Sequence, residues 1–422
     1  MPAKIHADMA HYITWVITFL AIAGVITRPF KIPEAVWAAS GAVILLVLQL
    51  ISPTEAFLGI TKGTDVYLFL IGMMLLAETA REEKLFDWLA AHATQMAKGS
   101  STRLFLLIYL VGVVVTTFLS NDATAVVLTP AVAAAVKAAK VEKPLPYLLI
   151  CAFIANAASF VLPISNPANL VIYGSHMPPL LQWLPRYIIP SIVAIVVTYL
   201  MLYLTQRKAL KQKIETDILM PILSEGGKTA IFGIAITAVI LLIASAMNIQ
   251  LGLPTAITGI LTSAIVIIRA RKNPWMVVKG VSWSVLPLVG GLFVLVEALS
   301  KTGIIQMLSV FLHQNAQSAV NQTAWGSGVI IAFACNLMNN LPVGLITGSV
   351  VQGDHIPEII KSSALIGVDL GPNLSITGSL ATILWLVALR REGQSVSAWA
   401  FLKLGFLIMT VALLFTIASL WI

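Results

Sequence analysis

Three consecutive polar residues, Ser120, Asn121 and Asp122, interrupt a long apolar part of the sequence. Apolar runs flank them at 104–118 and 123–136. A lipid bilayer offers no hydrogen bonds to a broken backbone, so protein or water must surround such an interruption. We therefore predict that Asn121 and Asp122 form the tip of a re-entrant helical hairpin over 102–139, and that this tip is one half of a transport site.

The composition places the chain in the membrane. Hydrophobic residues make up 59% of the 422 residues and charged residues 10%, whereas a soluble protein carries about a quarter charged residues. Apolar stretches long enough to cross a bilayer recur throughout, which predicts an all-α polytopic membrane protein. The net charge of +8 sits in short loops between these stretches, a pattern typical of membrane topology, so no nucleic-acid partner is expected.

About ten spanning helices and two hairpins follow from the apolar runs. Two segments, 85–97 and 304–313, are predicted to be interfacial, and a second hairpin covers 323–350 with its break at 339–342. The predicted spans are 12–26, 34–51, 65–80, one from 145 broken at 165–167, 186–205, 229–246, 254–268, 284–299, 359–389 broken around 369–379, and 401–421.

An internal repeat relates the two halves. Gly72, Glu78 and Asn121 recur 219 residues later as Gly291, Glu297 and Asn340, and at an offset of 213 Asn156 matches Asp369 while Ser165-Asn166 matches Gly378-Ser379. Inverted repeats with broken helices are typical of secondary transporters. We predict two inverted repeats of five spanning helices, at 1–206 and 229–422, each with a re-entrant hairpin and a broken helix, and joined by a cytoplasmic linker at 207–228.

The basic residues set the expected orientation. Most of the 26 lysine and arginine residues fall on one side of the predicted membrane if the N-terminus is outside, and basic loops favour the cytoplasm. Both termini are therefore predicted on the outer (periplasmic) side of a multi-pass protein of the cell (inner) membrane. No cleavable signal peptide is evident before the first apolar run.

Four carboxylates lie in apolar or broken-helix regions: Glu78, Asp122, Glu297 and Asp369. A carboxylate in the bilayer costs roughly 2.5 kcal/mol or more, so each needs a partner or a function. Asp122 and Asp369 are our candidate proton carriers, with helix capping as the alternative. For the repeat-related Glu78 and Glu297, the simpler interpretation is a capping or snorkelling role, and a part in coupling is the alternative.

Hydroxyl and amide side chains gather at the breaks, where helix ends also leave backbone groups free. Such a site suits a small polyhydroxy solute or an oxyanion; the alternative is that these side chains only satisfy the broken backbone. The candidate substrate-binding residues are Ser120, Asn121, Thr124, Ser165, Asn166, Asn339, Asn340, Asn373, Thr377 and Ser379.

No cofactor or metal site is expected. Cys151 and Cys335 both lie in apolar runs, and a lone buried cysteine usually acts as a small apolar residue. The sequence contains no phosphate-binding loop of the Gly-x-x-x-x-Gly-Lys-Ser/Thr type, which excludes ATP hydrolysis by that route. Pumping must draw on an ion gradient or on a separate ATPase subunit.

With these motifs in place, the chain resembles the ArsB family of arsenite and antimonite efflux permeases, within the ion transporter superfamily. The resemblance covers nearly the whole chain. It is carried by Ser-Asn-Asp-Ala-Thr-Ala-Val-Val-Leu-Thr-Pro at 120–130, Met-Asn-Asn-Leu-Pro at 338–342, Gly-Val-Asp-Leu-Gly-Pro-Asn at 367–373 and Gly-Ser-Leu-Ala-Thr at 378–382. Asn156 departs from the family, whose members often carry an acid there, so coupling would depend more on Asp122 and Asp369.

The resemblance implies export of the trivalent metalloids arsenite and antimonite, in exchange for protons. It also implies that the permease works alone or docks a cytosolic arsenite ATPase; a homodimer is left open. Neutral As(OH)3 can bind to amides and hydroxyls without thiolate ligands. One alternative is a sodium/proton antiporter or an anion (carboxylate) transporter of the same superfamily. A passive channel is less favoured, and an enzyme lacks a nucleophile–base pair or a metal-ligand set.

Overall fold

The computed structural model describes residues 2–174, 177–215, 220–352 and 356–422. Within these ranges the regular elements are helices, and one isolated β-bridge joins Ser100 to Lys213. The first half contains α1 (Pro2–Thr27), α2 (Glu34–Val47), α3 (Pro53–Lys62), α4 (Thr64–Glu82), α5 (Leu85–Met96), α6 (Ser101–Leu119), α7 (Asn121–Ala123), a π-helical segment (Thr124–Leu128), α8 (Thr129–Ala138), α9 (Leu145–Ala157), α10 (Pro167–Tyr173) and α11 (Leu180–Gln206).

The second half follows the same order of elements. It contains α12 (Glu225–Ala246), α13 (Gly252–Ala270), α14 (Pro274–Gly280), α15 (Val285–Lys301), α16 (Ile304–Ser318), α17 (Val320–Met338), α18 (Asn340–Val351), α19 (Glu358–Leu370), α20 (Leu380–Arg391) and α21 (Ala398–Ala418). The short helices α3 and α14, which the sequence analysis missed, occupy the same place in each half. The linker is shorter than predicted, because α12 begins at Glu225.

The two halves pack against each other in a crossed manner. Helix α4 of the first half lies against α13 of the second, and α15 of the second lies against α2 of the first. Gly72 and Gly291, which the repeat relates, sit at these two contacts: a Cβ on Gly72 would meet the backbone of Thr255, and one on Gly291 the backbone of Ala38. Both glycines therefore allow a close approach of two helix backbones.

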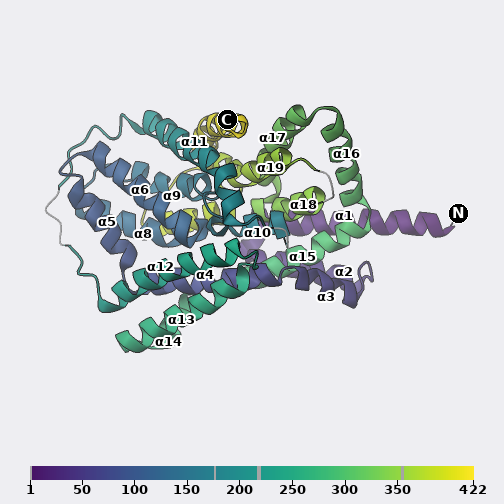
Figure 1. The fold of residues 1–422 in the computed structure, drawn as a ribbon, viewed down its shortest axis with the longest axis horizontal. Helices are drawn as coiled ribbons and strands as arrows, with labels where there is room; N and C mark the ends of the chain where they lie inside the picture. The colour runs from purple at the N-terminus through teal and green to yellow at the C-terminus, as the bar shows by residue number, and fades with distance from the viewer. Residues whose placement is uncertain (1, 175–176, 216–219, 353–355) are drawn as a thin grey trace.

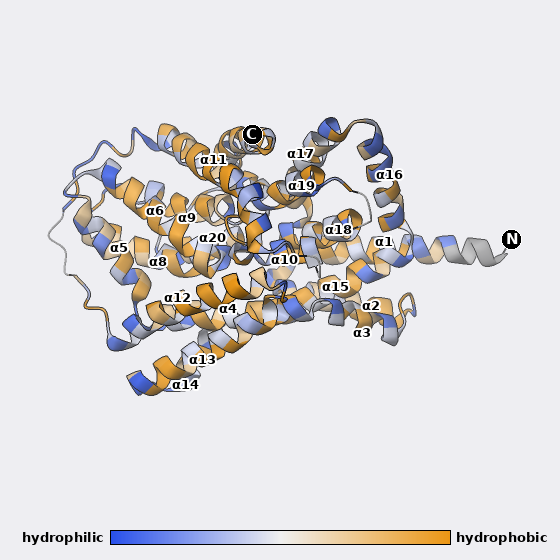
Figure 2. Cartoon of the chain, viewed as in Figure 1, coloured by the Kyte–Doolittle hydropathy of each residue, from blue (hydrophilic) through white to orange (hydrophobic). Residues whose placement is uncertain are grey.

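Two helices stand across the bundle at opposite ends. In Figure 1, α1, α4, α12 and α13 run largely from side to side, whereas α5 at the left and α16 at the right run steeply across them. Figure 2 shows hydrophobic residues along α11 and α12 and hydrophilic ones along the left-hand loops and α16. Helices α5 and α16 correspond to the two segments, 85–97 and 304–313, that we predict to be interfacial.

Helices α5 and α16 differ in how closely they pack. Helix α5 buries Leu85, Phe86 and Ala90 against α6 and α8. In α16 the buried residues are Ile305 and Ala316, and an apolar cavity of about 460 Å³ separates it from α17 and α18. The first hairpin therefore rests on its crossing helix, whereas the second stands partly clear of it.

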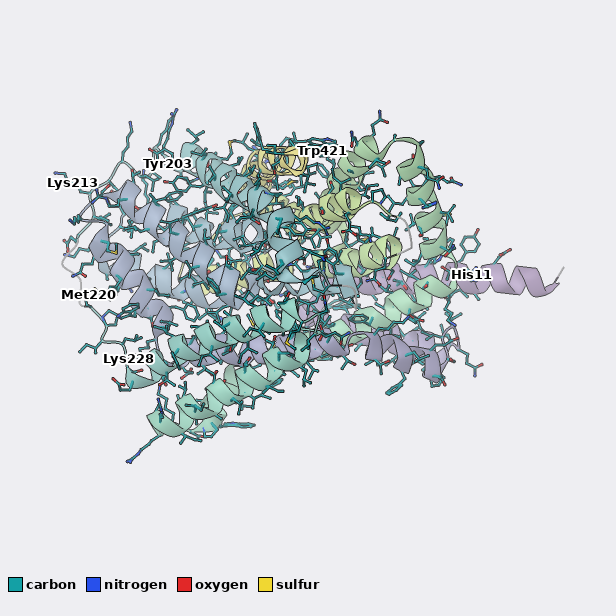
Figure 3. The ribbon with its side chains drawn as sticks, in the orientation of Figure 1. His11, Tyr203, Lys213, Met220, Lys228 and Trp421 are labelled. Carbon is teal, nitrogen blue, oxygen red and sulfur yellow. The ribbon has the colours of Figure 1, made fainter. Side chains whose placement is uncertain are left out.

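The N-terminal helix and the linker lie at opposite ends of the bundle. Figure 3 places Lys213 of the linker and Lys228, near the start of α12, at the left end and His11 of α1 at the right end. The C-terminal Trp421 donates a hydrogen bond from Nε1 to Oδ1 of Asn321 at 3.1 Å, near the start of α17 and so beside α16. The N-terminal helix and the linker are thus well separated, and the orientation of the termini in the membrane stays a prediction.

Seven helical segments of the described residues are long and apolar enough to cross a membrane, or eight if the bent pair α3–α4 is one span. They include α6, which we predict to be one arm of a re-entrant hairpin. Several other predicted spans are short or broken: α2 has 14 residues, and α9 and α19 have 13 each before their breaks. The multi-pass helical class is confirmed, and the count of ten spans stays a prediction.

The two broken helices are tied to each other inside the bundle. Trp385 of α20 is fully buried and donates from Nε1 to the carbonyl oxygen of Leu148 in α9 at 2.8 Å. The rings of Phe153 in α9 and Phe401 in α21 stack with their centroids 5.2 Å apart. These contacts hold the breaks of the two halves side by side.

Candidate functional site

Each hairpin turns at a residue with an unusual backbone. Ser120, between α6 and α7, has φ 103° and ψ 162°, and Asn339, between α17 and α18, has φ 71° and ψ 151°. A positive φ is uncommon outside glycine, and such strained residues cluster at functional sites. The two residues are repeat-related, so the same sharp turn begins the half-helix at both tips.

Each broken helix restarts from a capped end. The side chain of Asn166 accepts a hydrogen bond from the backbone N–H of Ala168 at 3.0 Å at the start of α10. Ser379 does the same for Thr382 at 3.1 Å at the start of α20. Such caps satisfy N–H groups that a helix start leaves free. Both predicted breaks are therefore ordered helix starts within the bundle.

The hairpin tips and the first break meet at one small cavity. Four polar side chains line it: Asn121, Asp122, Asn166 and Asn340. They come from both tips and from the start of α10, and the rest of the lining is apolar, including Leu70 of α4 and both Val285 and Val289 of α15. The cavity volume is about 30 Å³, which is room for a water or two.

Asp369 lies one hydrogen bond away from this cavity. It is fully buried in α19, and its Oδ1 accepts a hydrogen bond from Nδ2 of Asn166 at 2.5 Å. Its Oδ2 has no hydrogen-bond partner among the described residues. Asn166 therefore links the carboxylate of Asp369 to the cavity that Asp122 lines. The two predicted proton carriers belong to one connected site.

A second cross-half contact lies at the other break. Nδ2 of Asn156 in α9 donates to Oδ1 of Asn373 at 3.0 Å, and Nδ2 of Asn373 donates to the carbonyl oxygen of Phe153 at 3.0 Å. Ser379 Oγ donates to Oδ1 of Asn156 at 3.4 Å. By the repeat, Asn156 corresponds to Asp369 and Ser379 to Asn166, so the Ser379–Asn156 contact is the counterpart of the Asn166–Asp369 contact. Asn373 is an additional amide partner of Asn156.

Other predicted binding residues make framework contacts. Thr124 pairs with Thr116 across the first hairpin at 2.8 Å, and Ser165 donates to the carbonyl oxygen of Thr117 at 3.0 Å. Near the second tip, Asn339 donates to the carbonyl oxygen of Thr377 at 3.4 Å. These bonds join the hairpins to the breaks. Their part in substrate binding, like that of Ser120, Thr377 and Ser379, stays a prediction.

The sequence analysis missed three polar residues of this network: Asn169, Asn336 and Ser375. Asn169 donates from Nδ2 to the carbonyl oxygen of Ser159 at 2.9 Å and so fixes the loop between α9 and α10. Asn336 donates to the carbonyl oxygen of Gly371 at 2.9 Å and accepts from Ser375 at 2.7 Å. A polar side chain one helical turn from a break, as Asn169 and Asn336 both are, is the signal that could have found them.

The remaining carboxylates and thiols lie away from this cavity. Glu78 binds Arg81, and Glu297 binds Lys62 with 2.6 Å between Nζ and Oε2. Cys151 and Cys335 are free and buried, and neither lines the cavity of Asp122. Within the part of the chain that the structure describes, no group of three or more His, Cys, Asp or Glu residues could hold a metal ion.

Hairpin tips and broken helices that converge on a cavity lined by Asp122, one hydrogen bond away from the buried Asp369, are the arrangement expected of a membrane transporter. Residues 18–366 match the model of the citrate transporter family CitMHS, and the chain belongs to that family. It is 29% identical over 400 residues to the arsenical pump membrane protein of Escherichia coli K12, covering 91% of this chain and 92% of that one. The resemblance to ArsB-type permeases is thus confirmed.

A further relative and a solved structure are also similar to this chain. The putative arsenical pump membrane protein of Bacillus subtilis is 24% identical over 430 residues, covering 96% of this chain and 97% of that one. Among solved structures, the YdaH transporter of Alcanivorax borkumensis matches with a TM-score of 0.57 at 14% identity, over 87% of this chain and 86% of that one. The YdaH match supports the fold alone.

Proposed function

We propose that this protein is a secondary active transporter that exports trivalent arsenic and antimony, as arsenite and antimonite, from the cytoplasm in exchange for protons. The observation that carries the proposal is the convergence of Asn121, Asp122, Asn166 and Asn340 on one cavity, with Asp369 hydrogen-bonded to Asn166. The names of the relatives from Escherichia coli and Bacillus subtilis supply the substrate class.

The chemistry of the cavity favours a neutral substrate over an anion. The side chains that the structure places around it include three amides and one carboxylate, and no Lys, Arg or His is among them. A citrate ion would need cationic partners, typically arginine or lysine, and the Asp122 carboxylate would repel it. As(OH)3 carries hydroxyls that donate to a carboxylate and oxygens that accept from amides, so it matches this lining.

The carboxylates of Asp122 and Asp369 can also account for the exchange of substrate for protons. An ionised Asp122 accepts a hydrogen bond from a substrate hydroxyl, whereas a protonated carboxyl has lost its charge and is a weaker acceptor. An ionised Asp369 holds one N–H of Asn166, which leaves the second N–H of that amide for a substrate oxygen. Substrate and protons therefore favour opposite states of the site, as an antiporter requires.

Loading the site requires movement. The cavity holds a water or two at its present volume of about 30 Å³, and As(OH)3 is larger than water. The hairpin tips at Asn121 and Asn340 must therefore separate from the start of α10 to admit it. The apolar cavity beside α16 leaves space next to the second hairpin.

Arsenite flux in proteoliposomes tests the proposal. Purified protein is reconstituted, a pH gradient is imposed, and accumulation of As(III) and Sb(III) is compared with accumulation of citrate and of sodium. We expect metalloid accumulation that collapses when a protonophore removes the gradient. Citrate or sodium flux without metalloid flux would favour the family alternative, and metalloid flux unaffected by the protonophore would indicate a channel.

The proposed orientation is tested separately. We place the protein in the cell inner membrane with both termini outside and the linker at 207–228 in the cytoplasm. Single cysteines introduced at His11 and at Lys213, in a background without Cys151 and Cys335, should react differently with a membrane-impermeant thiol reagent on intact cells. Labelling at His11 alone supports the orientation, and labelling at Lys213 alone reverses it.

A further inference from the structure

A second cavity connects Asp122 to another carboxylate. It has a volume of about 60 Å³ and lies between α4, the first hairpin, and the segment that joins α14 to α15. Both Glu78 and Asp122 line it, together with Gly280 and Ser282. Asp122 thus faces two cavities, the one shared with Asn166 and the one shared with Glu78. Since one water needs about 10–15 Å³ of such space, this second cavity has room for several.

Glu78 connects this cavity to the surface of the molecule. Its carboxylate is buried, with 6% of the residue exposed, and it accepts hydrogen bonds from Nε of Arg81 at 2.8 Å and from Nη2 at 2.5 Å. The side chain of Arg81 is 43% exposed. The ion pair therefore has its carboxylate in the cavity and its guanidinium in solvent.

The chain makes room for the Glu78 carboxylate in this position. Gly280, the last residue of α14, approaches it so closely that a Cβ at that position would overlap the carboxylate. Gly280 lines the same cavity. Any larger residue there would displace the Glu78 side chain, so glycine at this position keeps the carboxylate in the cavity.

We infer that Glu78 passes protons between solvent at its end of the bundle and Asp122, through water in the cavity that both carboxylates line. The inference rests on the proposed proton-coupled export. Glu78 acts through Asp122 and does not touch the substrate cavity. Ser224 of the linker donates a hydrogen bond to Oε2 of Glu83, just after α4, so in the proposed orientation Glu78 serves the cytoplasmic side.

The charged groups around Glu78 leave this route open. Arg81, on its own helix, is its hydrogen-bonded partner. On the neighbouring helices, Lys279 of α14 is exposed to solvent, and Lys272, after α13, binds Glu83 instead, with 2.9 Å between Nζ and Oε1. Across the cavity the facing group is Asp122. A proton can therefore exchange between the two carboxylates without passing another titratable group that lines the cavity.

The repeat supplies a matched control. Glu297 stands in the second half where Glu78 stands in the first, and it also forms an ion pair, with Lys62. Its neighbour is Gly59 of α3. Among the described residues no hairpin carboxylate faces it, because the tip of the second hairpin carries Asn340-Leu341 where the first carries Asn121-Asp122. Replacing Glu297 removes an equivalent ion pair and leaves the proposed route intact.

The test compares Glu78→Gln with Glu297→Gln in proteoliposomes, using two readouts. Arsenite accumulation driven by a pH gradient needs net proton movement, whereas exchange of labelled for unlabelled arsenite at equal pH does not. We expect Glu78→Gln to slow proton-driven accumulation by at least about tenfold, less than the loss expected for a proton-transfer group at the reacting site, and to retain exchange. Glu297→Gln should retain both. Glu78→Asp should restore accumulation, with a shifted pH profile.

The other outcomes are decisive as well. If wild-type protein transports arsenite and the Glu78→Gln and Glu297→Gln variants accumulate it equally, the proton-passing role of Glu78 is contradicted and the proposed export function is not. Wild-type vesicles that move no arsenite in either mode contradict the proposed function, and the inference fails with it. If Glu78→Gln loses both modes, Glu78→Asp decides: recovery of accumulation supports an acid at this position, and continued loss contradicts it.

Discussion

Two contacts between the halves involve repeat-related residues, Asp369 and Asn156, and differ in chemistry. In one, Asp369 of α19 accepts a hydrogen bond from Asn166, at the break of the first half. In the other, Asn156 of α9 donates a hydrogen bond to Asn373, at the break of the second half. Asn156 and Asp369 are repeat-related, and their partners differ. Asp369 forms an acid–amide pair, whereas Asn156 forms an amide–amide pair with Asn373 in addition to its contact with Ser379, the counterpart of Asn166.

The amide pair is fully satisfied, and the acid pair is not. Asn156 and Asn373 both donate and accept hydrogen bonds within the described structure, whereas Oδ2 of Asp369 has no partner there. A satisfied buried polar network rigidifies its surroundings, and an unpaired buried oxygen is costly. We conclude that the Asn156–Asn373 pair serves as a neutral tether and that Asp369 is the group of the two pairs able to take up a proton.

The largest expected effect comes from replacing the one acid of the two pairs, Asp369, with an amide. Asp369→Asn turns the acid pair into a second amide pair of nearly the same shape. Proton-driven arsenite accumulation in proteoliposomes should fall at least about 100-fold, the lower end of what a positioned proton-transfer group contributes. Arsenite exchange at equal pH should persist, which also shows that the variant is folded. Proton-driven accumulation at the wild-type rate would remove Asp369 from the mechanism.

The sequence was enough to locate the four interruptions of this fold. Polar residues within apolar runs predicted both hairpin tips and both breaks, and the structure has a turn or a helix start at Ser120, Asn166, Asn339 and Ser379. Repeat-related glycines predicted the duplication, and the structure shows them at equivalent helix contacts. Polar interruptions of apolar runs can be recognised in the sequence because lipid tolerates neither unpaired backbone hydrogen-bonding groups nor uncompensated charge.

The sequence could not say which polar groups pair. Asn156, Asn166 and Asn373 are all amides near breaks, and their partners depend on how α9 and α19 pack across the interface between the halves. The short helices α3 and α14 were missed because each is too short to span the membrane. A cap was visible for α3, where Ser52 and Glu55 form a capping box, and Asn273 before Pro274 caps α14.

A second acid should convert the tether into a charged pair. Asn156→Asp places a carboxylate against Asn373 in a fully buried site. Because burying an uncompensated charge costs several kcal/mol, the stability of this variant in detergent should fall as the pH rises and the introduced carboxylate ionises. Thermal unfolding from pH 5 to 9, compared with wild type, measures this. A parallel pH dependence in the two proteins would show that the Asn156 site tolerates charge and is no neutral tether.

Removing one amide partner from each pair, Asn166 or Asn373, should destabilise the protein with a different pH dependence in the two cases. Asn166→Ala removes the hydrogen bond to Asp369 and the cap of α10, and losing a partner of a buried group costs about 1–3 kcal/mol. The loss should grow with pH, because the bond stabilises the ionised carboxylate. Asn373→Ala breaks amide contacts alone, so its cost of about 1 kcal/mol should not vary with pH. Equal pH profiles for the two variants would contradict the distinction.

The smallest expected effect concerns Ser165, a candidate substrate-binding residue that the structure ties to Thr117 in the first hairpin. Ser165 is fully buried and does not line the cavity of Asp122. If its role is to hold the break against the hairpin, Ser165→Ala should cost about 0.5–1.5 kcal/mol of stability and leave the arsenite concentration for half-maximal transport unchanged. Asn340→Ala, at a residue that does line the cavity, should raise that concentration. A rise of equal size in Ser165→Ala would place its hydroxyl on the substrate and extend the site beyond the acid–amide pair.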